Sequence, residues 1–338
     1  MSMKAVFQSR YGSTEDLTLT ERPVPVPAED EVLLKVGATS LHPDVWHVIT
    51  GLPWVLRLMG AGLSRPRNPV PGTDLAGVVE AVGARVTRFK QGDLVFGETI
   101  RGMQWVNGGA FAEWACASEH GLALKPANLS MEEAACLPTA GLIASLNLRH
   151  IGRLRSGSRV LVNGAAGGVG SLAVQMALAE GCTVTAVDAA DRLDWLRGLG
   201  VIRTLDYQVE DYTLCGERFD LVLDIPGNHG LREVKRVLAP DGVWVIVGHD
   251  NFGRNMNKLF GILPRMFGLM ARASFEKNLP RPSFQMPDKS SEMEYLRSLA
   301  DAGRLKPHLD RVFPLVEVRE ALRFLQEGRA QGRVVLIP

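Results

Sequence analysis

The chain has 338 residues, of which 46% are hydrophobic and 22% are charged, and this is the composition of an ordinary globular protein. Such a length exceeds one typical hydrophobic core and predicts two domains. Because 38 basic residues balance 37 acidic ones, the formal net charge is +1, and the chain as a whole has no field that would gather nucleic acid or an anionic membrane, which favours a small-molecule partner.

The first 122 residues have the pattern of an antiparallel, barrel-like region. Short alternating runs bounded by Gly, Pro or Asp predict its strands, among them "EVLLKVGATSL", "LAGVVEAVG" and "GDLVFGE". In "SLHPDVWHVITG", Asp44 is a candidate N-cap of the "VWHVI" helix. From about residue 125 the pattern changes, because "MEEAACLPTAGLIASLNLRHI" has helical spacing, with Ser130 as a candidate N-cap.

Strands then alternate with helices. The strands are "RVLVNG", "TVTAVD", "FDLVLDI" and "GVWVIVG", and the helices are "VGSLAVQMALAEG", "RLDWLRGLG" and residues 230–239. This alternation predicts a parallel, doubly wound sheet.

The last part of the chain follows Gly248. A Met- and Phe-rich stretch runs to about residue 275, and the Pro-rich linker "LPRPSFQMPDKSS" follows it. We then expect a helix over 292–302, a strand, a helix over 317–327 and a closing strand, "RVVLIP", that rejoins the first domain.

Cysteine spacing and hydropathy predict a cytoplasmic protein without a membrane span. The gaps between Cys116, Cys136, Cys182 and Cys215 are 20, 46 and 33 residues, which fit no metal or thioredoxin pattern, and free thiols are expected. The first residues lack a basic start followed by an apolar stretch, so we expect no signal peptide. No uncharged apolar run approaches the roughly 20 residues that a membrane helix needs.

"RVLVNGAAGGVGSLAVQ" is an apolar strand, a glycine turn and a helix, and it carries a dinucleotide-binding fingerprint with Ala in the first glycine slot. In that pattern Gly167 lets the backbone approach a pyrophosphate, and Gly170 lets the helix pack on the strand. A turn used only for tight packing is the alternative, but the flanking elements favour a nucleotide site. The residues of the turn are Ala165, Ala166, Gly167, Gly168, Val169 and Gly170.

Asp188 ends the strand "TVTAVD", 21 residues after Gly167. An Asp at this place can accept hydrogen bonds from both ribose hydroxyls of the adenosine half, and it repels a 2′-phosphate, so NAD(H) is favoured. Alternatively it caps the turn into the next helix, a role for which Asp191 competes.

These motifs together give the chain a family resemblance over nearly its whole length. It resembles the medium-chain dehydrogenase/reductase superfamily, and most of all its zinc-independent quinone (enone) oxidoreductase branch. Besides the glycine turn, the segments that carry the resemblance are "VPGTDLAGVVEAVGARVTRFKQGDLVFG", "GGAFAEW", "EAACLPTAGLIA", "LGVIRTLDY", "FDLVLDIPG" and "HLDRVFPLVEVREALRFLQEGRAQGRVVLIP".

The resemblance implies an α/β protein in which a GroES-like β-barrel domain is combined with a Rossmann domain, a doubly wound parallel sheet. Residues 1–123 would form the first part of the barrel domain, 124–275 the Rossmann domain, and 276–338 the return to the barrel domain. The active site would lie in the cleft between the domains, and a homodimer would be the assembly.

The resemblance also bears on zinc. Zinc-dependent relatives place a Cys, a His and a Cys at or near the positions that hold His42, Thr73 and Ala140 here. One possible ligand remains, and a catalytic zinc usually needs three protein ligands. The four cysteines of a structural zinc loop are also missing from residues 97–110. His47 is five residues from His42 and would not share a helix face with it, so we expect no metal.

Without zinc, hydrogen-bond donors must polarise the substrate. The reaction implied is hydride transfer from a reduced nicotinamide to a quinone or an enone-type double bond. His42 stands where the family often has Asn, and it could donate a hydrogen bond or a proton if it faces the cleft. A packed or surface histidine is the alternative. Asp44 matches a family position close to the cleft, where it would either orient a neighbouring side chain or cap the "VWHVI" helix. No Tyr lies between residues 12 and 206, so no firm general acid is named.

Further cofactor contacts follow by resemblance. Thr139 and Arg333 would approach the nicotinamide end of the cofactor, and Tyr207 would lie near the adenine end. Ile225 and Gly248 would lie at the carboxyl edge of the sheet, where ligands bind. Arg192 stands where some relatives bind a 2′-phosphate, which leaves NADP(H) possible.

Two apolar segments and two other functions stay open. Residues 52–68 either form a lid over the substrate or simply pack against the domain. Residues 257–275 could line the cleft, form a dimer contact or touch a membrane surface. Pro264 interrupts this segment and argues against one long amphipathic membrane helix. The alternatives for function are a zinc-free alcohol dehydrogenase or enoyl-thioester reductase, and a nucleotide-binding protein without turnover.

Overall fold

The structure is a computed structural model that describes residues 1–102, 106, 108–248, 257–281 and 287–338. These residues divide into two compact units. The first unit holds Met1–Thr139 and Asp288–Pro338 with residues 257–261, and the second holds 140–248 with 262–281 and 287. The boundaries of the units, after Thr139 and before Asp288, differ from those of the expected domains, 1–123, 124–275 and 276–338.

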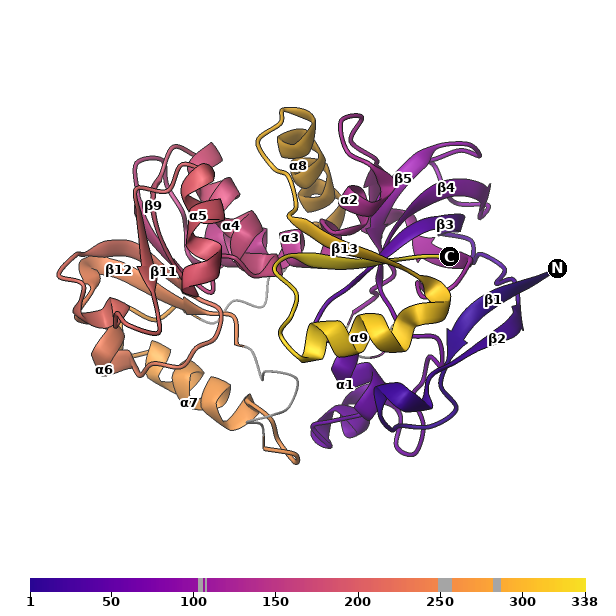
Figure 1. The fold of residues 1–338 in the computed structure, drawn as a ribbon, viewed down its shortest axis with the longest axis horizontal. Coiled ribbons are helices and arrows are strands. Elements are labelled where there is room, and N and C mark those ends of the chain that lie inside the picture. Colours follow the sequence, from indigo (N-terminus) through magenta and orange to yellow (C-terminus); the bar gives the residue numbers. More distant parts are fainter. Residues whose placement is uncertain (103–105, 107, 249–256, 282–286) are drawn as a thin grey trace. The chain divides into compact units, whose positions relative to one another are not determined.

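The first unit is built on a sheet with the strand order β13-β14-β3-β4-β5-β7, in which β6 also pairs with β3. Figure 1 labels β3, β4, β5 and β13 of this sheet. Most pairs are antiparallel, as the alternating runs predict, and β13 and β14 are parallel. The closing strand pairs with β3, where Val334 lies opposite Leu41, so the last strand shares a sheet with the first domain. β1 (Ser2–Phe7) and β2 (Thr18–Pro23) pair with each other in a separate two-stranded sheet. The strands of the larger sheet are β3 (Glu31–Leu41), β4 (Asp74–Val82), β5 (Leu94–Glu98), β6 (Trp114–Ser118), β7 (Leu122–Leu124), β13 (Leu309–Pro314) and β14 (Arg333–Ile337).

The longer helices of this unit cover the sheet with apolar faces. On α9, Val318, Ala321 and Leu322 recur at helical spacing and join one buried cluster with Ile49 of α1 and Leu336 of β14. Burial of such faces, rather than helix propensity, stabilises these short helices. The helices are α1 (Val45–Thr50), α2 (Met131–Ala135), α8 (Lys289–Asp301) and α9 (Val318–Gln326), with short helical turns at Thr14–Asp16, Arg57–Ala61, Glu119–Gly121 and Leu315–Glu317.

The helical region after residue 130 begins at the predicted cap and is then interrupted. The Ser130 hydroxyl accepts the Glu133 N–H at 3.1 Å, and the Glu133 carboxylate accepts the Ser130 N–H at 3.0 Å, which is a complete capping box. The helix α2 ends before Pro138, which opens α3 (Pro138–Ser145), and a further helical turn covers Leu146–Ile151. Proline has no N–H and restricts the residue before it, so one continuous helix is not formed.

The second unit is a five-stranded, fully parallel sheet with the order β10-β9-β8-β11-β12. Figure 1 shows α4 and α5 on one face of this sheet, and α6 and α7 on the other. The predicted doubly wound architecture is therefore confirmed. The elements are β8 (Arg159–Asn163), α4 (Gly168–Ala179), β9 (Thr183–Asp188), α5 (Leu193–Gly198), β10 (Arg203–Asp206), β11 (Phe219–Asp224), α6 (Leu231–Val234), β12 (Leu238–Ile246) and α7 (Leu263–Ala273), with helical turns at Ala190–Arg192 and Tyr212–Leu214.

The helix expected over 230–239 is wrong in extent, because α6 ends at Val234 and β12 already begins at Leu238. The Phe219 N–H donates to the Val237 carbonyl at 2.8 Å, and Phe219 lies opposite Leu238 in the ladder. Pairing with β11 therefore draws these residues into the sheet and overrides their local helical pattern.

The helix expected over 292–302 begins earlier, at Lys289. The Asp288 carboxylate accepts the Ser291 N–H at 2.8 Å and so caps the helix inside the stretch predicted as linker. Part of that linker, 282–286, lies outside the described residues.

None of the helices within the described ranges has both the length and the hydropathy that crossing a membrane would require.

Candidate functional site

The glycine turn between β8 and α4 is held against β9. The N–H groups of Gly164 and Ala165 both donate to the Val187 carbonyl, at 2.9 and 3.0 Å. Gly164 has φ +80°, a conformation that favours glycine. A Cβ at Gly170 would lie 2.0 Å from the Gly164 carbonyl oxygen, so only glycine permits this close approach of helix to turn.

The start of α4 has the features of an anion site. Its first N–H groups have no acceptor within the helix, and the helix dipole favours negative charge there. Gly167 occupies the N-cap position without a side-chain cap, which leaves the backbone open to a ligand. The turn therefore fits the pyrophosphate of a dinucleotide, as its sequence predicts.

Asp188, the last residue of β9, is 6% exposed and braces the turn. One carboxylate oxygen accepts the Ala166 N–H at 2.7 Å, and the other accepts the Ala189 N–H at 2.9 Å. Each oxygen has a second lone pair, so capacity for ribose hydroxyls remains. Arg192 lies beside it, with Nη1 3.9 Å from Oδ1. The bond to Ala166 is a role that the sequence pattern did not reveal.

Tyr207, Ile225 and Gly248 follow the carboxyl ends of three strands of this sheet. The Tyr207 N–H donates to the Asp188 carbonyl at 3.2 Å, and the Ile225 N–H donates to the Asn163 carbonyl at 3.1 Å. Gly248 follows β12 with φ +84°. The structure thus places these three predicted cofactor contacts at one edge of the second unit.

Asp224 ties the same edge together, and the sequence analysis did not single it out. Its buried carboxylate accepts hydrogen bonds from the Asn163 amide at 2.9 Å and from the Gly227 N–H at 2.9 Å. The Trp244 indole N–H also donates to it, at 3.2 Å, and Tyr212 at 3.4 Å. A lone Asp at the end of the apolar run "FDLVLD" was the available signal.

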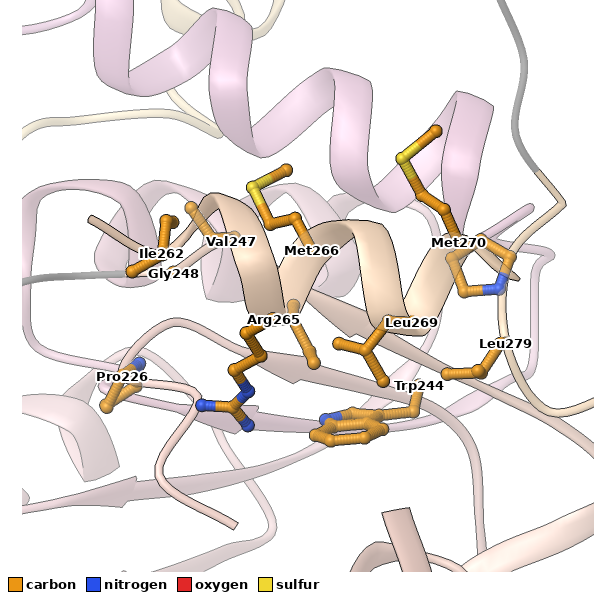
Figure 2. A pocket seen from close by; sticks show the side chains of 12 residues that line it. Pro226, Trp244, Val247, Gly248, Ile262, Arg265, Met266, Leu269, Met270 and Leu279 are labelled. Atoms are coloured by element: carbon orange, nitrogen blue, oxygen red, sulfur yellow. The ribbon is translucent and has the colours of Figure 1, made fainter. Parts of the chain in front are cut away.

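An apolar pocket of about 160 Å³ lies between α7 and this edge. Figure 2 shows Arg265 and Leu269 pointing from α7 toward Trp244, which forms the opposite wall. The Arg265 guanidinium donates to the carbonyls of Gly227 and His229. Part of the 257–275 segment therefore lines a pocket inside the second unit.

His42 is buried in the first unit. Its Nε2 lies 3.1 Å from the Thr73 hydroxyl, and its Nδ1 lies 3.5 Å from the Asp44 carboxylate. Asp44 precedes α1 but makes no side-chain capping bond, so of the two expected roles the structure favours orienting a neighbour. Burial disfavours the charged ring, but Asp44 and Asp74 outweigh it, and the pKa of His42 is raised.

A buried polar network centres on Asp74, the first residue of β4, which is 0% exposed. Its Oδ1 accepts the Thr139 N–H at 3.2 Å and also contacts the Thr139 hydroxyl. Its Oδ2 accepts the Ser40 hydroxyl at 3.3 Å and lies 3.4 Å from Arg333 Nη2. Arg333 Nη2 also donates to the Ser40 hydroxyl, at 2.6 Å.

Glu98 extends this network toward the surface. One of its oxygens lies 2.9 Å from the Thr139 hydroxyl, and the other accepts the Lys289 ammonium at 2.6 Å. Lys289 also donates to the Ile100 carbonyl, at 2.8 Å, and its side chain is 32% exposed. Burial raises the pKa of Glu98, the neighbouring Asp74 raises it further, and Lys289 opposes both without reversing the direction.

The network changes how two predicted cofactor contacts are understood. The structure brings Thr139 and Arg333 together at Asp74, where both bind carboxylates or hydroxyls of the first unit. No sequence motif pointed to the roles of Asp74, Glu98 or Lys289. The acidic residues in "PGTDLAG" and "LVFGE" break apolar runs, but their partners are far away in sequence.

Among the described residues, no three or more His, Cys, Asp or Glu side chains are grouped so as to hold a metal ion. His42 contacts the hydroxyl of Thr73, at one of the positions compared with zinc ligands. His47 is engaged elsewhere, with Nδ1 2.6 Å from the Leu52 carbonyl oxygen.

Comparison with known proteins identifies two family models in the chain. Residues 28–127 match an alcohol dehydrogenase GroES-like domain, and residues 199–336 match a zinc-binding dehydrogenase domain.

Three relatives span nearly the whole chain. A chloroplastic quinone-oxidoreductase homolog of Spinacia oleracea is 32% identical over 99% of this chain and 98% of its own length. A chloroplastic NADPH-dependent alkenal/one oxidoreductase of Arabidopsis thaliana is 30% identical over 99% of this chain and 80% of its own. The solved quinone oxidoreductase of Coxiella burnetii superposes with a TM-score of 0.82 and 28% identity, and it covers 100% of both chains. These relatives confirm the resemblance drawn from the sequence.

Replacing Gly170 by Ala should destabilise the second unit by about 1–3 kcal/mol, because the new Cβ meets backbone atoms that cannot move freely. Gly268→Ala is the matched control, because Gly268 lies within α7 and a Cβ there meets nothing within 4 Å. This variant should be more stable than wild type by about 0.5–1 kcal/mol in the free energy of unfolding. Chemical denaturation followed by circular dichroism measures both. An unchanged midpoint for Gly170→Ala would contradict the close approach at the turn.

Glu98→Gln should change how stability depends on pH. The folded state raises the pKa of Glu98 above its unfolded value. The stabilisation that protonated Glu98 gives to the folded state is therefore fully present below the unfolded pKa and is lost as pH rises through the folded pKa. The variant should therefore gain stability relative to wild type as pH rises across that window. Denaturation of both proteins over a pH series measures the difference, and a difference of the opposite sign would refute the raised pKa.

Proposed function

The chain belongs to the medium-chain dehydrogenase/reductase superfamily, in its zinc-independent quinone oxidoreductase-like branch, and we propose that it reduces quinones or enone-type double bonds with a reduced nicotinamide cofactor. The observation that carries the proposal is the pairing of an open helix start at the glycine turn with the carboxylate of Asp188. Similarity to relatives named for quinone and alkenal/one reduction supports the substrate class.

The second unit supplies the groups that would hold the cofactor. The backbone of residues 165–170 would bind the pyrophosphate, and Asp188 would accept ribose hydroxyls. Tyr207 stands beside Asp188 through its backbone bond, in line with a place at the adenine end. Ile225 and Gly248 follow the ends of neighbouring strands, at the edge where such sheets bind ligands.

A nicotinamide bound in this way supplies hydride to the substrate. The chain's own contribution is then a hydrogen bond or proton at the substrate oxygen, and we assign this role to His42. Its raised pKa keeps the ring protonated to higher pH than an ordinary histidine, and Asp44 orients the ring. Thr139 and Arg333 are proposed to approach the nicotinamide end while remaining bound to Asp74.

NAD(H) is proposed as the preferred cofactor, with NADP(H) as a usable one. A carboxylate at Asp188 would repel a 2′-phosphate, whereas Arg192, 3.9 Å away, would attract it. The relative named as NADPH-dependent shows that use of NADPH occurs among related chains.

No zinc is part of the proposed mechanism. Of the three compared positions only His42 offers a ligand, and its Nε2 lies next to the Thr73 hydroxyl rather than another metal-binding side chain. All four cysteines are free thiols, which supports a reducing compartment such as the cytoplasm. A homodimer also remains a proposal, and light scattering measures it.

Asp188→Asn should shift the ratio of kcat/KM for NADPH over NADH upward by about tenfold or more. The amide removes the charge but can still accept the Ala166 N–H, so the turn is retained, which Asp188→Ser does not ensure. Asp191→Asn is the control, since it removes an exposed carboxylate three residues along the chain and should leave the ratio nearly unchanged. A wild-type kcat/KM for NADPH that equals or exceeds the value for NADH would contradict the proposed preference.

The proposed reaction is tested by oxidation of NADH and NADPH with a 1,4-naphthoquinone, an alkyl vinyl ketone and an enoyl thioester, together with alcohol oxidation in the reverse direction. We expect turnover of the quinone or the enone that a metal chelator does not reduce. Turnover of the thioester alone, or alcohol oxidation that a chelator abolishes, would favour the other dehydrogenase reactions. Cofactor binding without any turnover would favour a nucleotide-binding protein.

A further inference from the structure

The contacts around Thr139 require more hydrogen atoms than its side chain possesses. Its hydroxyl lies within hydrogen-bond distance of the carboxyl oxygens of both Asp74 and Glu98. A threonine hydroxyl has one hydrogen to donate. Two satisfied bonds therefore need a second proton, and one of the two carboxyl groups must carry it.

Glu98 is the better holder of that proton. Asp74 accepts the Thr139 N–H and the Ser40 hydroxyl and lies against the Arg333 guanidinium, so its two oxygens already act as acceptors for several donors. Glu98 is 4% exposed, its ion pair within the described ranges is with Lys289, and burial raises its pKa. In this arrangement Glu98 donates to Thr139, and Thr139 donates to Asp74.

The chain of contacts has an outer and an inner end. At the outer end the partly exposed Lys289 binds Glu98 and connects the network to solvent. At the inner end Ser40, bound to Asp74, lines a small cavity that it shares with His42 and Thr73. The cavity volume of about 10 Å³ is close to the lower limit for one water molecule.

We propose that Lys289, Glu98, Thr139, Asp74 and Ser40 form a proton relay that returns a proton to His42 after each turnover. This inference rests on the proposed function, which it extends by naming the source of the proton. None of the five residues has to touch the substrate, and they act through His42.

The proton balance of the relay is simple. Hydride addition to a quinone or an enone leaves an anion that must take one proton, and the His42 imidazolium gives it. Asp74 takes the hydroxyl proton of Thr139 and passes a proton to Ser40, while the hydroxyl proton of Ser40 moves through a cavity water to His42. Thr139 takes the proton of Glu98, and solvent restores Glu98 by way of Lys289. One proton enters and one leaves with the product, and no electrons move along the relay.

The charged groups facing the relay are consistent with it. Arg333 holds Asp74, Lys289 holds Glu98, and Asp44 and Asp74 favour the imidazolium of His42. The Cys136 thiol nearby stays protonated, because burial raises its pKa to about 12. No other ionisable group is therefore needed in the path.

Infrared spectroscopy of the intact protein tests the shared proton without any substrate. At neutral pH the wild type should show the carbonyl stretch of a buried protonated carboxylic acid, and Glu98→Gln should lack it. Glutamine can still accept from Lys289 and donate to Thr139, so the packing is kept. Thr139→Val should shift the band by removing its acceptor, and Thr139→Ser should restore it. Absence of the band in the wild type overturns the proposal.

Isotope effects test the relay in turnover, with an alkyl vinyl ketone as substrate. Glu98→Gln and Thr139→Val should lower kcat by about tenfold or more, with KM for the ketone changed by less than the fall in kcat. Because proton delivery then limits turnover, the solvent deuterium isotope effect on kcat should rise. The isotope effect on kcat from a cofactor that carries deuterium at the transferred hydride position should fall toward one. A role confined to structure would leave both isotope effects as in the wild type and would overturn the relay.

Thr39→Val is the matched control. Thr39 is buried like Thr139, at 0% against 4% exposure, and its hydroxyl donates to the Asp74 main-chain carbonyl at 2.6 Å, not to its carboxylate. It should leave the infrared band and both isotope effects unchanged, and a change as large as that of Thr139→Val would overturn the relay. If neither quinone nor enone is turned over, the proposed function fails and the catalytic role of the relay fails with it. The infrared result decides separately whether Glu98 holds the proton.

Discussion

The carboxylate of Asp74 is the constraint on which the polar interior of the first unit depends. A fully buried charge is tolerated only when it is paired and hydrogen-bonded, and removing one partner of such a pair typically costs about 3–5 kcal/mol. Asp74 meets this requirement with Thr139, Ser40 and Arg333, which come from α3, β3 and β14. Three distant parts of the chain are therefore held at one point, and their side chains are oriented before any ligand arrives.

A second carboxylate has a comparable role in the other unit. Asp188 accepts the N–H of Ala166, so the strand that carries the proposed ribose-binding group also fixes the turn proposed to bind the pyrophosphate. The short distance between Gly170 and the Gly164 carbonyl adds a steric constraint at the same place. The two halves of the proposed nucleotide site are thus coupled mechanically, and a change in Asp188 affects more than the charge near the ribose.

Asp188 and Glu98 are both buried carboxyl groups, but their neighbours suit them to different functions. Asp188 has backbone donors and retains acceptor capacity for a ligand, which suits recognition. Glu98 has a single hydroxyl between itself and another acid, which suits the storage and transfer of a proton. The difference comes from the number and type of hydrogen atoms that the neighbours provide, not from the carboxyl group itself.

The sequence by itself determined the fold class, the glycine turn and its Asp188, because these depend on local periodicity and on short spacings along the chain. Ser130 capped its helix as expected, for the same reason. Only the tertiary structure decided that the helix after residue 230 ends at Val234, because pairing with β11 outweighs the local pattern. It alone also joined Glu98, Thr139 and Lys289, whose positions are 41 and 150 residues apart in succession, since contacts between such distant residues depend on how the strands and helices pack.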